Sequence, residues 1–279
     1  MKQTETIRLA ILDMYEGTPN EGMRGIKQII EEFEADCHLP VHFEIFDVRL
    51  KAEVPGPDYD VYISTGGPGS PLDSANSVWE NRYFELMESI KTFNKENPNQ
   101  KKHVFLICHS FQVFCRYYGF GLVSKRKGTS FGVMPGHKTD TGHHDPLLRS
   151  IGDPFWAVDS RDYQLTQPDN KKIKEGGGSI LCIEKFRPHI DLERAIMAIR
   201  FNDAFFGTQF HPEADAAGMR MYLLRDDKKE LVIEKHGEKK YWEMIDHLND
   251  PDKIMLTRNA IIPRFLMMAL HHKLSSVSI

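Results

Sequence analysis

The chain has 279 residues, of which 41% are hydrophobic and 27% are charged, as is usual for a globular protein. Its length suits one large domain, or one domain with a substantial appendage. The formal net charge of −4 argues against a broad cationic surface for nucleic acid or an anionic membrane.

Strand-like and helix-like segments alternate along the first part of the chain. An apolar run predicts a buried strand at 7–14, further strands are predicted at 41–48 and 59–64, and another apolar run lies at 104–107. Apolar residues at helical spacing predict helices at 23–33 and 79–93, and another helix follows residue 108. Such alternation produces parallel pairing with right-handed crossovers. We therefore predict an α/β fold with an open, mostly parallel sheet flanked by helices.

The character of the chain changes twice after this region. Residues 128–178 are rich in Gly, Pro, Asp and His, so we expect antiparallel strands and loops there, with an exposed turn at 171–178. A final strand is predicted at 204–210. Apolar residues at helical spacing then predict helices toward the C-terminus. We expect a main domain over residues 1–215 and a helical C-terminal extension over residues 216–279 that packs on it.

Cys108 is a candidate nucleophile. It ends the apolar run at 104–107 and is followed at once by a predicted helix. A nucleophile on a sharp strand-to-helix turn is the elbow used for acyl chemistry. The positive end of the helix dipole and a nearby unpaired N–H both favour the reactive thiolate. The alternative, a buried structural cysteine, is the commoner role of a free thiol and fits Cys115 better.

A glycine-rich turn at 65–71 follows the third predicted strand. Its glycines allow the backbone to approach a ligand closely and to point N–H groups at it. The turn lacks the Lys-Ser/Thr pair of a P-loop, which disfavours nucleotide phosphate. We expect an oxyanion hole made by the N–H groups of Gly67 and His109, at the same sheet edge as Cys108.

The segment His211-Pro212-Glu213 supplies a base. On extended backbone, side chains two residues apart lie on the same face. Glu213 can therefore hold the His211 imidazole in the tautomer that a nucleophile requires. Together with Cys108, the two residues are the parts of a Cys-His-Glu triad.

Three motifs, at 64–70, 107–112 and 207–213, resemble the signatures of class I (triad) glutamine amidotransferases in sequence, order and spacing. The most specific is Gln-Phe-His-Pro-Glu at 209–213, and the resemblance covers roughly residues 7–215. It implies a flavodoxin-like fold and attack on the glutamine side-chain amide, through a glutamyl thioester that releases ammonia. Cys108 would be the nucleophile, His211 the acid and base, and Glu213 its orienter.

The resemblance also implies the substrate contacts. Gln112 and the turn from Gly67 to Gly69 would contact the bound glutamine. The family often has a Ser-His-Gly-Asp stretch that lines the glutamine pocket, and the matching region here is 159–162. We therefore predict Ser160 and Arg161 as further substrate-binding residues.

The chain departs from the family pattern in two places. The family elbow usually reads Gly-x-Cys-x-Gly, where glycines relieve crowding around a strained nucleophile. Here the two flanking positions are Leu106 and Ser110. The altered 159–162 region favours a second hypothesis, a hydrolase of γ-glutamyl peptides or amides that uses the same triad. Leu106 suggests a third, a regulatory or binding homologue that has lost activity.

His109 raises a rival interpretation. Cys-His in tandem resembles the PfpI-like peptidase and chaperone proteins, which share the elbow and the broad fold but lack Gln-Phe-His-Pro-Glu. Side chains that are adjacent in sequence diverge at an elbow, so we interpret His109 as a backbone N–H donor. The run 143–145, His-His-Asp, lacks the spacing of metal ligands. We therefore predict no metal and no other cofactor.

Partners and compartment follow from what the chain lacks. It contains neither a Ser-Gly-Gly-x-Asp-Ser pyrophosphatase loop nor a P-loop, so a separate synthase subunit would have to activate the ammonia acceptor. None of the four cysteines is in a Cys-x-x-Cys pair, no secretory signal precedes the first strand, and no apolar run approaches ~20 residues. We expect a reduced, cytoplasmic protein that binds neither nucleic acid nor membrane.

Overall fold

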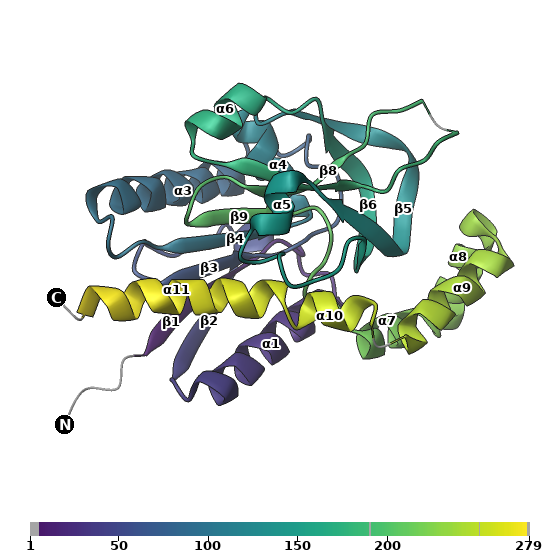
Figure 1. The fold of residues 1–279 in the computed structure, drawn as a ribbon, viewed down its shortest axis with the longest axis horizontal. Helices are drawn as coiled ribbons and strands as arrows, with labels where there is room; N and C mark the ends of the chain where they lie inside the picture. The colour runs from purple at the N-terminus through teal and green to yellow at the C-terminus, as the bar shows by residue number, and fades with distance from the viewer. Residues whose placement is uncertain (1–5, 190, 251, 278–279) are drawn as a thin grey trace.

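The structure is a computed structural model and describes residues 6–189, 191–250 and 252–277. Within these residues, nine strands form one sheet with helices on both faces (Figure 1). The strands are β1 (Ile7–Asp13), β2 (Val41–Asp47), β3 (Val61–Ser64), β4 (His103–Ile107), β5 (Leu122–Lys138), β6 (Phe155–Thr166), β7 (Ser179–Glu184), β8 (Ile196–Arg200) and β9 (Phe205–Thr208). The helices before residue 200 are α1 (Glu21–Cys37), α2 (Val48–Lys51), α3 (Val78–Glu96), α4 (His109–Tyr118), α5 (Asp140–His144) and α6 (Asn170–Glu175).

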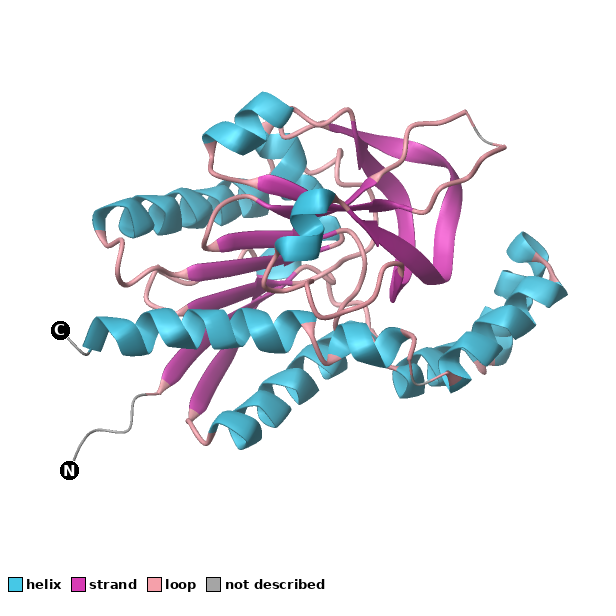
Figure 2. Cartoon of the chain, in the orientation of Figure 1, coloured by secondary structure: helices cyan, strands magenta, loops and turns pink. Residues whose placement is uncertain are grey.

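The sheet has the order β2-β1-β3-β4-β9-β8-β7-β5-β6. The five strands from β2 to β9 are parallel to one another, and each later pair is antiparallel. Figure 2 shows the long strands β5 and β6 at the end of the sheet away from β1 and β2. The predicted fold class is confirmed, with a parallel half that is extended by an antiparallel half.

Two apolar cores lie on opposite faces of the parallel strands. Isoleucines of α1 and the apolar side of α11 (Ile261–Val277) cover one face, where the two helices run side by side (Figure 1). Helices α3 and α4 cover the other face. The central strands β1 and β4 are largely buried on both faces and carry apolar runs, which is why the sequence pattern located them.

Two local predictions need correction. The exposed turn expected at 171–178 is largely the helix α6, which begins where the Asp169 side chain accepts a hydrogen bond from the Lys172 N–H at 2.9 Å. Ile173 buries one side of this short helix, and a single apolar residue gives no readable period. The strand β8 was not predicted, and the strand expected at 204–210 is limited to Phe205–Thr208.

In the described part of the chain, five helices follow residue 215: α7 (Ala216–Leu223), α8 (Asp226–His236), α9 (Glu238–Asn249), α10 (Ile254–Arg258) and α11. Tyr241 and Met244 of α9 pack with Val133 of β5 and Val158 of β6 in a third apolar cluster. The C-terminal helices therefore contact both halves of the sheet. The division of the chain at residue 215 stays a prediction. Among the described residues, no helix combines the length and apolar character needed to cross a membrane.

Candidate active site

The three sequence motifs meet at one edge of the sheet. Strands β3, β4 and β9 are neighbours, and each ends directly before one motif. The glycine turn follows Ser64, the nucleophile follows Ile107, and His211 lies three residues after Thr208. Because the carboxyl ends of parallel strands share one edge, the fold brings the three motifs together there.

Cys108 has the backbone geometry of a strained elbow, with φ 48° and ψ −95°. This combination is unfavourable for a residue with a Cβ atom and persists only where surrounding contacts impose it. The Cys108 N–H donates to the Thr208 carbonyl at 2.7 Å, and the Cys108 carbonyl accepts from the Gln112 N–H at 3.0 Å. The turn is therefore attached to β9 on one side and to α4 on the other.

Ser110 replaces a family glycine and gives the elbow an additional attachment. Its buried hydroxyl accepts from the Ile107 N–H at 2.9 Å and donates to the Ser64 carbonyl at 2.8 Å. The hydroxyl thus ties the elbow to the end of β3.

Leu106 replaces the other family glycine and is fully buried. Its partner across the ladder is Gly207 of β9. A Cβ atom at position 207 would lie 3.4 Å from the Leu106 Cβ and 2.6 Å from the Phe111 ring. Leu106 is therefore accommodated because the neighbouring strand has no side chain opposite it.

We expect Ser110→Ala to lower the free energy of unfolding by about 1 to 3 kcal/mol, because it removes the partner of two buried backbone groups. Urea denaturation of the purified variant measures this loss. Ser89→Ala is the matched control, since the Ser89 hydroxyl bonds a carbonyl on an exposed helix face. Equal stabilities of the two variants would contradict the role assigned to Ser110.

His211 and Glu213 form the second half of the site. The His211 Nδ1 lies 2.8 Å from the Glu213 Oε1, and the imidazole also hydrogen-bonds the Cys108 sulfur. Glu213 is completely buried. Burial alone would lower the pKa of His211, but the charges of Glu213 and Cys108 outweigh it and raise that pKa well above 6.5. The surroundings of His211 therefore favour its protonated, imidazolium form.

The glycine turn packs directly against this pair. A Cβ atom at position 66 would lie 2.9 Å from the His211 ring, and one at position 67 would lie 2.2 Å from the Met14 carbonyl. Arg49 ties the turn to the residue that follows β1 by donating to the carbonyls of Met14 at 3.1 Å and Pro68 at 2.6 Å.

The expected oxyanion donors, Gly67 and His109, flank Cys108 on the glycine turn and at the first position of α4. Within the described part of the chain, neither backbone N–H donates a hydrogen bond. Both groups are therefore available to a developing oxyanion.

The His109 side chain has no place in the triad. It is buried away from the surface, and its Nε2 has no hydrogen-bond partner within the described residues. Burial, together with the charges of Arg49 and Arg116, lowers the pKa of His109 to about 3. The imidazole is therefore neutral at physiological pH, which is consistent with a purely backbone contribution from this residue.

Gln112, a predicted substrate contact, lies beside the nucleophile. Its amide nitrogen donates to the Tyr163 carbonyl at 3.1 Å and to the Gln209 Oε1 at 3.0 Å. The Gln209 amide in turn donates to the Cys108 sulfur at 3.6 Å. With its nitrogen fixed in this way, the Gln112 side-chain oxygen remains available to accept a hydrogen bond from a ligand.

The other predicted substrate contacts differ in their surroundings. Ser160 is exposed, and its carbonyl accepts a hydrogen bond from the Cys108 thiol at 3.7 Å. Arg161 is instead buried and pairs with Asp159 at 2.9 Å and Glu184 at 3.1 Å. Its guanidinium is thus not presented to a ligand beside Cys108. Gly69, with φ +83°, lies on the outer part of the turn near Arg49.

The structure adds two residues that the sequence analysis did not select. Gln209 contacts the nucleophile, and its place two residues before His211 on extended backbone could have indicated a shared face. Tyr15 lies just beyond β1 at the same sheet edge, and its buried hydroxyl is close enough to Glu213 and Cys108 for their charges to raise the pKa of Tyr15 well above 10, after the larger effect of burial.

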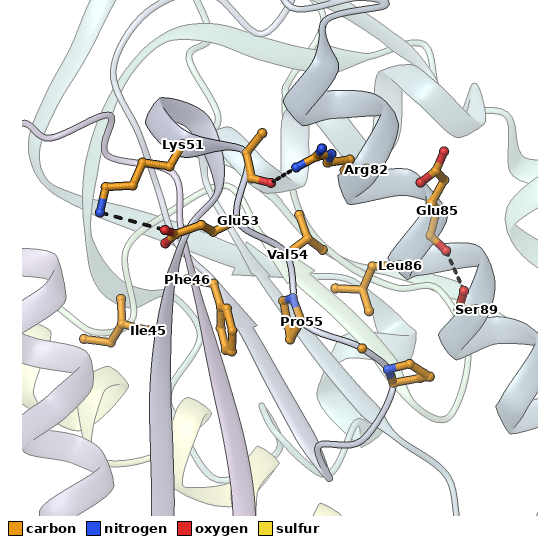
Figure 3. A pocket seen from close by; sticks show the side chains of 13 residues that line it. Ile45, Phe46, Lys51, Glu53, Val54, Pro55, Arg82, Glu85, Leu86 and Ser89 are labelled. Atoms are coloured by element: carbon orange, nitrogen blue, oxygen red, sulfur yellow. Dashed lines mark hydrogen bonds and ion pairs between the residues drawn. The ribbon is translucent and has the colours of Figure 1, made fainter.

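One large cavity lies apart from this site. It has a volume of about 700 Å³ and lies between β2, the segment after α2, and α3 (Figure 3). Arg82 donates to the Ala52 carbonyl at 3.0 Å on its wall, and Lys51 pairs with Glu53. No residue of the Cys108 site lines this cavity.

A cysteine at a strained strand-to-helix elbow, beside a His–Glu couple at the carboxyl edge of a parallel sheet, is the arrangement that cysteine-dependent triad enzymes use. A family model described as Glutamine amidotransferase class-I matches residues 25–231. The chain therefore belongs to the class I glutamine amidotransferase family.

Solved structures with similar folds include two glutamine amidotransferases. The one from Thermotoga maritima is 14% identical, with a TM-score of 0.66 over 94% of this chain and 98% of that one. The one from Methylobacillus flagellatus is 16% identical, with a TM-score of 0.64 over 95% of this chain and 94% of that one. At these identities, the likeness describes the fold.

Two curated relatives carry different names. A homoserine O-acetyltransferase of Petrotoga mobilis is 26% identical over 75% of this chain and 63% of the relative. A homoserine O-succinyltransferase of Psychromonas ingrahamii is 25% identical over 68% of this chain and 55% of the relative. The chain thus spans less than two thirds of the length of either relative.

Proposed function

We propose that the protein cleaves the side-chain amide of glutamine through a thioester on Cys108. The observation that carries this proposal is the contact of Cys108 with the His211–Glu213 couple, beside a glycine turn whose Gly67 N–H donates no hydrogen bond within the described residues. Membership of the class I glutamine amidotransferase family supports glutamine as the substrate.

The reaction proceeds in two steps, formation of the thioester and its hydrolysis. The Cys108 sulfur bonds to the amide carbon, the N–H groups of Gly67 and His109 stabilise the oxyanion, and His211 protonates the departing nitrogen as ammonia. In the second step, His211 removes a proton from water, and the water oxygen bonds to the thioester carbon. The carbon–sulfur bond then breaks and releases glutamate, and the proton taken from water remains on His211, beside the freed Cys108 sulfur. Glu213 orients the imidazole in both steps.

The fate of ammonia is the next part of the proposal. The chain has neither a pyrophosphatase loop nor a P-loop with which to activate an acceptor. We propose that a separate synthase subunit receives the ammonia, and that the helices after residue 215 are a candidate surface for docking it.

A second candidate function is O-acyl transfer. Both curated relatives described above are named as homoserine acyltransferases, one acetyl and one succinyl. The same triad can hold an acetyl or succinyl group as a thioester on Cys108 and pass it to a hydroxyl group, with His211 as the base. The two candidates therefore share the acyl-enzyme and differ in the acyl donor and acceptor.

Labelling with 6-diazo-5-oxonorleucine, a glutamine-like electrophile, tests the first candidate without a synthase subunit. We expect one adduct by intact-mass spectrometry, located on Cys108 by peptide mapping and prevented by excess glutamine. Burial raises the pKa of Cys115 well above 9, so this thiol is an internal control that stays unmodified.

The opposite result is equally informative. If Cys108 resists 6-diazo-5-oxonorleucine but reacts with a small alkylating agent, the glutamine proposal is wrong. Incubation with acetyl and succinyl thioesters, followed by the same mass measurement, then tests the second candidate through the mass of the acyl-enzyme.

A further inference from the structure

A second cavity, with a volume of about 670 Å³, opens on the antiparallel half of the sheet. Its walls come from β5, from the segment between β7 and β8, and from helices α8 and α9. Seven lysine and arginine side chains and three carboxylates line it among the described residues. The cavity is therefore strongly cationic in a chain whose net charge is −4.

The carboxylates of the cavity are already engaged or exposed. Glu184 pairs with Arg126 at 2.9 Å, with Arg161 at 3.1 Å and with Arg187 at 2.7 Å. The Glu193 carboxylate accepts a hydrogen bond from the Gln167 N–H at 2.7 Å. The single carboxylate of Glu184 thus pairs with three arginines, so the positive charge of the cavity lining is not neutralised.

Three lysines of the cavity lack an anionic partner within the described residues: Lys125, Lys127 and Lys185. The only hydrogen-bond contact of the Lys185 Nζ there is the Met134 sulfur, at 3.8 Å. Burial, followed by repulsion from Arg187 and Lys240, lowers the pKa of Lys185. Cationic side chains that lie close together without counterions repel one another, and a bound anion relieves this repulsion.

We propose that this cavity binds a small molecule through its phosphate or pyrophosphate group. A concave site of this volume suits a small ligand rather than a flat protein surface, because ligand cavities measure about 300 to 1,000 Å³. Arginine forks and lysine ammonium groups are the side chains that recognise phosphate oxygens. The inference does not depend on which acyl reaction Cys108 performs.

The cavity also lies close to the nucleophile along the sheet. Phe131 lines it and pairs with Ser160 across the β5–β6 ladder. The Ser160 carbonyl is the group that accepts the hydrogen bond from Cys108. A ligand held by its phosphate groups could therefore extend toward the active site along this pair of strands.

Isothermal titration calorimetry with sodium pyrophosphate tests the proposal on the full chain, at constant ionic strength and in buffer free of phosphate and sulfate. We expect saturable binding at one site. Lys127→Gln and Lys185→Gln should each weaken it about tenfold, because each removes one charge-assisted contact. Adenosine diphosphate, titrated in parallel, distinguishes the sources: tighter binding identifies an organic phosphate, and weaker binding identifies the inorganic anion.

Lys239→Gln is the matched control. Lys239 is exposed on α9 next to Lys240 but does not line the cavity, so its variant should bind pyrophosphate like the unmodified chain. Thermal melts check that all variants are folded. Absence of saturable heat with the unmodified chain, or equal affinities of the Lys185 and Lys239 variants, would overturn the proposal. Because the measurement needs no turnover, its failure is distinct from failure of the acyl chemistry.

Discussion

Replacing Cys108 with alanine is expected to abolish the acyl-enzyme and to lower turnover by about 10⁴-fold or more, whichever acyl group the enzyme transfers. The sulfur is the atom to which the acyl carbon bonds, and no neighbouring group can replace it. Gln209 and Gln112 carry neutral amides, and the His109 imidazole points into a buried environment. The fold should persist, because the elbow is held by its backbone bonds and by Ser110.

Cys115→Ala is the matched control for this experiment. It lies on the same helix, is fully buried and belongs to the apolar core that covers one face of the sheet. We expect it to lower the free energy of unfolding slightly and to leave turnover and labelling of Cys108 intact. Loss of adduct formation in both variants would mean that the chemistry depends on packing around α4 rather than on the Cys108 sulfur.

The convergence of the site was predictable because its parts lie at strand ends. A motif after a buried parallel strand must lie at the carboxyl edge of the sheet, so the glycine turn and Cys108 were placed together from local patterns alone. The position of His211 depended on β9 pairing with β4, which is a contact between segments about 100 residues apart in sequence. Only the resemblance to a family with the same motif order pointed to it.

Other features depend on contacts that no local pattern reveals. Leu106 at the elbow suggested crowding, but Gly207 on the neighbouring strand β9 leaves space for it. The strand pairing that places Gly207 opposite Leu106 could not be read from the sequence. Arg161 was predicted to line a substrate pocket only because the region 159–162 matches a pocket-lining stretch of the family. Its burial against Asp159 and Glu184 depends on how β5, β6 and β7 pair.

Glu213→Gln is expected to lower turnover by roughly 10³- to 10⁴-fold, because a neutral amide neither holds the reactive tautomer of His211 nor stabilises its imidazolium. It should also lower the pKa of His211, since burial then opposes protonation with only the Cys108 charge to offset it. NMR titration of the imidazole, assigned by the signal missing in His211→Asn, measures this shift.

The same substitution should change how stability depends on pH. The pKa of His211 in the folded protein lies well above its ordinary value of 6.5. The ion pair with Glu213 therefore contributes fully to stability below about pH 6.5, and its contribution is lost as the pH rises through the folded-state pKa. Urea denaturation between pH 6 and pH 9 measures this change. The free energy of unfolding of the unmodified chain should exceed that of Glu213→Gln by the largest amount at pH 6, and the difference should narrow as the pH rises.

Glu80→Gln separates this effect from the general cost of losing a buried carboxylate. Glu80 is buried and pairs with Arg116, whose guanidinium keeps its charge throughout this range. Its variant should therefore lose a similar amount of stability at every pH from 6 to 9. If the two variants show the same pH dependence, the His211–Glu213 couple is not a proton-linked pair, and the raised pKa assigned to His211 is wrong. If the stability loss varies with pH only for Glu213→Gln, Glu213 stabilises the positive charge on His211, as the reaction requires.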